Sequence, residues 1–156
     1  MPVNLGDLAA PNSNPASVAL IDCLDWDHPR EYTHGEIDRL ADACARGLAK
    51  RGLKRGESVA ILSANRAEFL VAYFGIMRAG LVAVPVNHKF PRGTIEFVLR
   101  DSATRLAFCD KERRASAPPD LPVVEFGARS DAPSEWTSFL DAGEFATVIP
   151  DAGKPR

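Results

Sequence analysis

The sequence predicts an α/β fold with a mostly parallel sheet and helices on both faces. Three short segments, at residues 58–63, 81–86 and 105–110, are rich in β-branched and aliphatic side chains and are interpreted as buried strands. Helical segments separate them, and strand-helix-strand crossovers join parallel strands. The second strand is too apolar to be half exposed, which is typical of a sheet covered on both faces.

The segment between the first two strands predicts the central helix of the fold. Asn65 and Glu68 fit a capping box at its start, and Gly80 fits the position just after its end. Residues 67–77 are almost entirely apolar, so we expect this helix to be covered on more than one side. Its large apolar side chains are expected to be buried, namely Phe69, Phe74 and Met77.

The residues before the sheet predict a small hairpin and a long amphipathic helix. Residues 16–22 and 31–33 are the two strand segments, joined by a polar turn. Thr33 and Glu36 fit a capping box, and apolar residues then recur at three- and four-residue steps as far as the stop at Gly52. This helix is therefore expected to lie with one face on the sheet.

Two aromatic residues and the later segments complete the pattern. Trp26 is interpreted as a packing residue and His28 as a surface or satisfied core residue. Pro91 suits the first turn of a helix through residue 101, between the second and third strands. The later elements are a last strand at 121–126 and a single helical turn at 134–140.

Composition favours one globular domain. The chain has 156 residues, of which 46% are hydrophobic, and this is enough to bury a core of useful size. We expect an irregular lead-in at residues 1–15, one α/β domain at residues 16–140 and an irregular tail at residues 141–156.

Charge, hydropathy and cysteine usage exclude several classes of function. The net charge of −2 provides no basic field for nucleic acid. No signal peptide and no membrane-spanning run are visible, so we expect a cytoplasmic protein without a membrane span. Cys23, Cys44 and Cys109 are odd in number and lack CxxC spacing, which predicts buried free thiols rather than disulfides or a zinc site.

Three segments carry a resemblance to a known family. Residues 32–37 (YTHGEI), 52–61 (GLKRGESVAI) and 77–87 (MRAGLVAVPVN) resemble, in spelling, order and spacing, the first core motif, the intervening segment and the second core motif of the AMP-forming adenylating enzymes. This family includes acyl- and aryl-CoA synthetases, luciferases and peptide-synthetase adenylation domains. The resemblance covers roughly residues 32–110, and its weight comes from the linked pieces, since each motif alone is little more than a helix cap and a buried strand.

The resemblance implies a fold and a parent activity. The fold would be the first subdomain of the N-terminal domain of such an enzyme. The parent would be an acid-thiol ligase that uses ATP and magnesium to convert a carboxylic acid into an acyl-adenylate and then transfers the acyl group to coenzyme A. Asn87 favours acyl- and aryl-CoA synthetases, because peptide-synthetase domains usually carry an aspartate there. The implied partners are the remainder of the ligase and its carboxylic acid substrate.

The family's catalytic groups have no counterpart in this sequence. It lacks the Ser/Thr/Gly-rich phosphate loop, the ribose-binding aspartate and the lysine of the mobile C-terminal domain, and residues 152–156 (AGKPR) match only the end of that loop. Dinucleotide-binding, metalloprotease and nucleophile-elbow motifs are missing as well. We therefore expect no catalytic residue and no metal ligand, no tight binding of ATP, coenzyme A or magnesium, and an inactive scaffold.

One cofactor contact follows from the resemblance. In CoA ligases of this family a basic residue just after the second motif contacts the nucleotide end of coenzyme A, and the matching position here is Lys89, with Arg92 close behind. The family usually has arginine at this place, and a lysine near a helix N-terminus can still meet a phosphate. The alternative is a solvated loop cation.

For the whole chain, other functions stay open. One is a non-catalytic interaction or dimerisation module, which would show an exposed apolar patch. The others are a fragment of a peptide-synthetase adenylation domain and a small flavodoxin-like binding domain. The last of these would need a phosphate-binding loop after a strand, and residues 63–66 contain no glycine that would allow a close approach.

Overall fold

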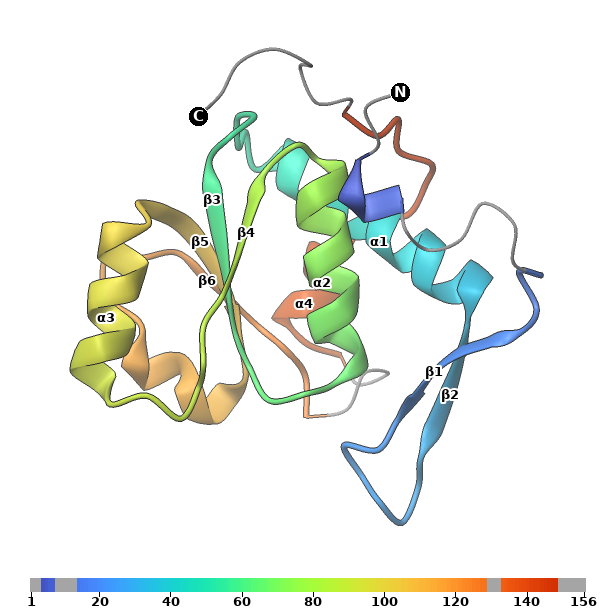
Figure 1. Ribbon diagram of the computed structural model, residues 1–156, viewed down its shortest axis with the longest axis horizontal. Helices are drawn as coiled ribbons and strands as arrows, with labels where there is room; N and C mark the ends of the chain where they lie inside the picture. The colour runs from blue at the N-terminus through green and yellow to red at the C-terminus, as the bar shows by residue number, and fades with distance from the viewer. Residues whose placement is uncertain (1–3, 8–13, 129–132, 149–156) are drawn as a thin grey trace.

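Figure 1 shows the computed structural model of the chain, which describes residues 4–7, 14–128 and 133–148. Its centre is a parallel sheet of four strands in the spatial order β4-β3-β5-β6. The strands are β3 (Ser58–Leu62), β4 (Val82–Pro85), β5 (Thr104–Cys109) and β6 (Val123–Glu125). The parallel α/β sheet predicted from the sequence is confirmed, with small shifts at the strand ends. The expectation that the second strand is too apolar to be half exposed is wrong, because β4 is an edge strand whose residues are half-buried or exposed.

Helices cover both faces of the sheet, as predicted. Helices α1 (His34–Lys50), α2 (Ala67–Arg78) and α4 (Glu135–Phe139) pack on one face, and α3 (Arg92–Asp101) packs on the other. Strand β3 can be covered on both faces because it carries apolar side chains on both sides. Val59 and Ile61 belong to the core under α1, α2 and α4, while Ala60 and Leu62 belong to the core under α3.

The order of the strands creates a reversal in the winding of the sheet. The crossover through α2 places β4 on one side of β3, and the crossover through α3 places β5 on its other side. Such crossovers are right-handed. Helix α2 runs toward one edge of the sheet and α3 toward the other, so the two helices lie on opposite faces. The reversal point lies between β3 and β5, at the carboxyl ends of the strands, where doubly wound folds bind ligands.

The start of α1 follows the sequence pattern closely. The Glu36 amide donates to the Thr33 hydroxyl at 3.2 Å, and the Thr33 amide donates to the Glu36 carboxylate at 2.8 Å, so the predicted capping box is confirmed. The hydrogen bond from the Thr33 backbone lowers the pKa of Glu36. Gly52 follows the helix with a φ of +74°, a conformation that glycine adopts without steric cost.

The start of α2 differs from the prediction. The helix begins at Ala67, and the expected capping box between Asn65 and Glu68 does not form. Instead the Ala67 amide donates to the Asp22 carboxylate of the hairpin at 2.9 Å. The Glu68 carboxylate is unavailable as a cap because it is paired with the buried guanidinium of Arg66.

The prediction that the large side chains of α2 are buried is also wrong. Phe69, Phe74 and Met77 are only half-buried. Helix α1 approaches so closely that a Cβ atom at Gly75 would lie 2.7 Å from Cys44 Sγ. Small and β-branched residues therefore form the buried face, including Val71, Ala72 and Ile76. Phe69 and Phe74 pack against this core with part of their surface exposed.

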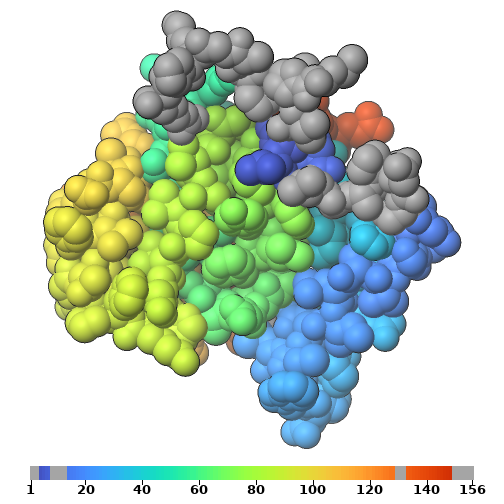
Figure 2. Space-filling view, viewed as in Figure 1, coloured from blue at the N-terminus to red at the C-terminus, as the bar shows by residue number. Residues whose placement is uncertain are grey.

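A hairpin outside the main sheet forms before α1. Strands β1 (Val18–Asp22) and β2 (Arg30–Thr33) pair antiparallel in a separate two-stranded sheet, as predicted. Its turn protrudes from the body of the molecule (Figure 1, Figure 2). Trp26 is consequently 82% exposed, so its interpretation as a packing residue is wrong. His28 is exposed beside Asp25, as a surface histidine would be.

The remaining segments are short. The 3₁₀ helix η1 (Leu5–Asp7) lies in the lead-in, and a second one, η2 (Lys111–Ser116), follows β5. Residues 141–148 contain no helix or strand. Residues 1–3, 8–13 and 149–156 lie outside the described residues, and with them the phosphate-loop-like residues 152–156.

Two further features are the state of the cysteines and the lengths of the helices. All three cysteines are free, and Cys44 and Cys109 are buried while Cys23 is half-buried. Burial raises the pKa of the Cys109 thiol to about 12. No helix within the described ranges is long and apolar enough to cross a membrane.

An aromatic cluster under α4 supplies a test of the core. Phe108 is fully buried, and its ring centroid lies 5.2 Å from those of Trp136 and Phe139. We expect Phe108→Ala to lower the free energy of unfolding by about 3–5 kcal/mol, since it leaves a cavity. Phe97→Ala is the control, because Phe97 is 65% exposed, and it should cost less than about 1 kcal/mol. If the two variants lost the same free energy of unfolding in urea titrations, this packing would be contradicted.

Candidate functional site

The carboxyl ends of β3 and β5 meet at a cluster of buried polar groups. Asp110 follows β5 and is only 4% exposed. Its carboxylate accepts a hydrogen bond from the Ser63 hydroxyl at 2.9 Å and another from the Ala64 amide at 2.8 Å, both just after β3. Arg113 of η2 donates to the same carboxylate at 2.7 Å. Asp110 thus binds the ends of the two strands together.

Arg66 fills the space between Asp110 and the start of α2. All three of its side-chain nitrogens donate hydrogen bonds: Nε and Nη2 to Glu68 at 2.8 and 2.9 Å, and Nη1 to Asp110 at 3.0 Å. Nη2 also donates to the Gly127 carbonyl at 2.7 Å. Burial opposes the charge of Arg66, but hydrogen bonds and Coulomb attraction to Glu68 and Asp110 outweigh it and raise its pKa.

This network closes the reversal point of the sheet. Two arginines and two carboxylates balance one another there, and the guanidinium of Arg66 has its nitrogens engaged by protein groups. A phosphate would have to displace a buried carboxylate, which costs several kcal/mol. Among the described residues, no group of three or more His, Cys, Asp or Glu side chains could hold a metal ion. The network at the reversal point therefore does not fit ATP phosphates or magnesium.

The loop after β4 lies at the same edge of the sheet but is open. His88 donates from Nδ1 to the Ser63 carbonyl at 3.1 Å, which holds the start of the loop against β3. Lys89 follows and is exposed, and its amide donates to the Asn87 side chain at 3.0 Å. Arg92 is exposed in the first turn of α3, whose N-cap is Pro91.

The two basic residues that the sequence singled out are thus close together in the chain, on one loop and the helix it leads into. Within the described part of the chain, neither Lys89 nor Arg92 has a side-chain hydrogen bond or an ion pair. Helix α3 has ten residues and no side-chain cap. Its first amides, together with two cations, form a surface that suits a phosphate group.

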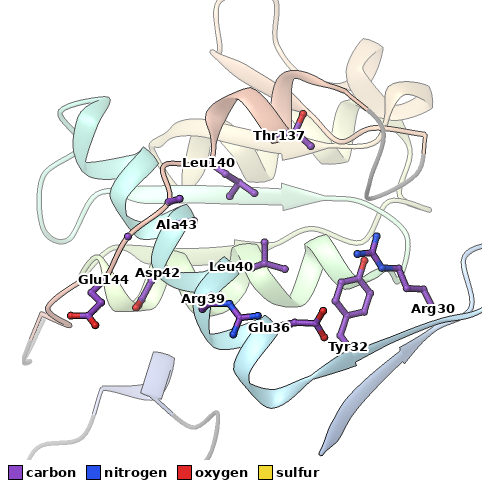
Figure 3. A pocket seen from close by; sticks show the side chains of 12 residues that line it. Arg30, Tyr32, Glu36, Arg39, Leu40, Asp42, Ala43, Thr137, Leu140 and Glu144 are labelled. Atoms are coloured by element: carbon purple, nitrogen blue, oxygen red, sulfur yellow. The ribbon is translucent and has the colours of Figure 1, made fainter. Parts of the chain in front are cut away.

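A separate groove of about 710 Å³ lies beside α1 (Figure 3). Leu40, Ala43 and Leu140 supply apolar surface, while Arg39 and Glu144 are charged groups at its border. This volume lies within the range of small-molecule pockets. Neither of the predicted site residues lines it, so it is distinct from the loop after β4.

Sequence reasoning missed the network at the strand ends. The pattern of Asn65 and Glu68 predicts a helix cap, whereas in the structure Asn65 is exposed and Glu68 is buried as the partner of Arg66. A signal was present, because Asp110 directly follows a buried strand and lies at the edge where the next parallel strand also ends. What the sequence does not show is that Arg66 turns inward to meet it.

The network provides a prediction about stability. Asp110→Asn removes one charge but keeps the shape of the side chain, and it leaves Arg66 buried with one carboxylate partner. We expect the free energy of unfolding to fall by about 3 kcal/mol. Asp120→Asn is the control, since Asp120 pairs with Arg100 at the surface, and it should change stability by less than about 1 kcal/mol. A small effect for both variants in urea titrations would show that the network contributes little.

Comparison with known proteins agrees with this architecture. The family model for AMP-binding enzymes matches residues 9–153. The chain is 30% identical over 121 residues to the long-chain-fatty-acid–CoA ligase FadD13 of Mycobacterium tuberculosis, which covers 77% of this chain and 23% of that ligase. It is 35% identical over 83 residues to the 3-hydroxybenzoate–CoA ligase of an Aromatoleum species, covering 53% and 16%.

A solved structure shares the fold. The ATP-bound crystal structure of MatB from Rhodopseudomonas palustris superposes with a TM-score of 0.81 at 24% identity, and covers 97% of this chain and 31% of MatB. The chain spans less than a quarter of the length of the two ligases named above. The family match extends well beyond the three motifs and includes nearly all of the described fold. The chain belongs to the AMP-binding enzyme family.

Proposed function

We propose that this chain is the N-terminal part of an AMP-forming acyl- or aryl-CoA ligase, which joins a carboxylic acid to coenzyme A and converts ATP to AMP and pyrophosphate. The family match over residues 9–153 carries this proposal. The similarity to two CoA ligases and the Asn87 ending of the second motif support the choice of coenzyme A as acceptor. ATP, coenzyme A and magnesium are then cofactors of the whole ligase.

The proposed role of the chain within that ligase is a scaffold. Its reversal point is filled by Arg66 and Asp110, so the nucleotide contacts would come from later parts of the ligase. Exposed apolar residues gather on the hairpin, where another part of a ligase could cover them: Val18, Ile21, Leu24 and Trp26. A surface of this kind suits a contact with the remainder of the ligase.

The first test concerns adenylation by the isolated chain. We expect no pyrophosphate exchange with any carboxylic acid, because paired protein charges fill the reversal point of the sheet and the sequence lacks the family's phosphate loop and catalytic lysine. Electrostatic stabilisation by such groups is usually the largest part of the rate. The ligase that contains this chain should catalyse the exchange and form the CoA thioester. Exchange by the chain alone would refute the scaffold role, and a full-length protein that adenylates without using coenzyme A would refute the CoA ligase.

We also propose that Lys89 and Arg92 contact the phosphates of coenzyme A. Their exposure, and the helix N-terminus beside Arg92, support this role. A lysine acts on a phosphate as a point charge, while an arginine can add a second hydrogen bond. The two residues would therefore attract the dianionic 3′-phosphate without taking part in the chemistry.

Kinetics of the full-length ligase test this contact. Lys89→Ala should raise the KM for coenzyme A about tenfold, the effect of losing one exposed charge-assisted contact, and should leave the adenylation half-reaction unchanged. Lys89→Arg should restore most of the affinity. Lys54→Ala is the matched control, because Lys54 is an exposed lysine in the turn before β3, at the opposite end of the sheet. An unchanged KM, or a loss of adenylation, would refute the assignment.

A further inference from the structure

The last carbonyls of α2 are capped by two segments that are far apart in the sequence. The last four carbonyls of a helix have no partner within it. The Met77 carbonyl accepts a hydrogen bond from Asn4 Nδ2 at 2.8 Å, and the Arg78 carbonyl accepts one from the Val148 amide at 2.9 Å. Residues 4–7 and residues 147–148 therefore meet at the end of this helix.

Asn4 joins these two segments directly. Its Nδ2 also donates to the Val148 carbonyl at 2.8 Å, and its Oδ1 accepts from the Gly6 amide at 2.8 Å, so both ends of the amide are used. The side chain of this residue is almost fully buried. A second bond runs beside it, from the Thr147 hydroxyl to the Asp7 carboxylate at 2.8 Å. We call this set of bonds between residues 4–7 and residues 147–148 the clasp.

The turn at residues 4–7 is seated tightly on α2. A Cβ atom at Gly6 would lie 2.7 Å from Arg78 Cγ and 2.8 Å from the Phe74 carbonyl, so only glycine fits there. Arg78 Nε donates to the Gly6 carbonyl at 3.0 Å. The turn is thus a rigid half of the clasp, because it is held to the helix by contacts that do not involve residues 147–148.

The segment that enters the clasp is also held at its other end. Asp141 pairs with Lys50 at 2.9 Å and with Arg46 at 2.8 Å, and its amide donates to the Ala43 carbonyl at 3.1 Å. The hydrogen bond from Lys50, together with the charge of Arg46, lowers the pKa of Asp141. Between the two anchors, residues 142–144 form one wall of the groove beside α1 (Figure 3).

We propose that residues 141–148 are a strap that closes one side of this groove, and that the clasp at Asn4 decides whether the strap is closed. The strap contains no helix or strand, so its release leaves the sheet and its helices intact. Each hydrogen bond of the clasp adds a modest amount to the stability of the closed form. Opening of the strap therefore requires less free energy than global unfolding.

Hydrogen exchange of single amides tests the clasp. In Asn4→Ala the Val148 amide should exchange about tenfold faster, because the bond that holds its residue is lost. The amides of Val59 and Ile61 in β3 should keep their protection. Asn14→Ala is the matched control, since Asn14 makes a similar turn bond, to the Ala16 amide at 3.0 Å, away from the clasp. It should leave Val148 unchanged.

NMR relaxation of the same variants tests the strap. In Asn4→Ala, fast backbone motion should increase at Gly143 and Glu144, which line the groove. If Asn4→Ala fails to fold, Thr147→Val removes only the bond to Asp7 and should produce the same changes to a smaller degree. The proposal is refuted if Val148 stays protected and residues 143–144 stay rigid, or if β3 loses protection as much as Val148 does.

Discussion

The buried pair of Arg66 and Asp110 is the interaction on which the arrangement of the sheet depends. It joins the segment after β3 to the end of β5, and through Gly127 it reaches the segment after β6. Charges that are buried in this way stabilise a fold only when each has its partners, and the loss of one partner leaves an uncompensated charge. The pair therefore restricts how the strand ends can be placed relative to α2.

A second buried arginine does the same at the other end of α2. Arg78 donates to the Asp38 and Asp42 carboxylates of α1 and to the Gly6 carbonyl. Burial opposes its charge, but the hydrogen bonds to the two aspartates outweigh this and raise its pKa. Helix α2 is thus held by a paired arginine at each end.

The proposed scaffold role rests on how the reversal point of the sheet is filled. The reversal point of the sheet, which is the usual place for a nucleotide in such folds, is occupied by protein charges here. The open features lie elsewhere: the loop with Lys89, the groove beside α1 and the apolar surface of the hairpin. The groove also borders the hairpin, because Arg30 and Tyr32 of β2 line it.

The sequence by itself determined the strands, the parallel sheet, the capping box at Thr33 and the family, because these follow from local patterns of apolar residues and from short motifs. Tertiary structure alone decided which side chains of α2 are buried, since the close approach of α1 at Gly75 leaves no room for large residues. It also decided the cap at Ala67, the pair at Asp110 and the clasp at Asn4. Their partners are distant in the sequence, and no local pattern records a contact that exists only once the chain has folded.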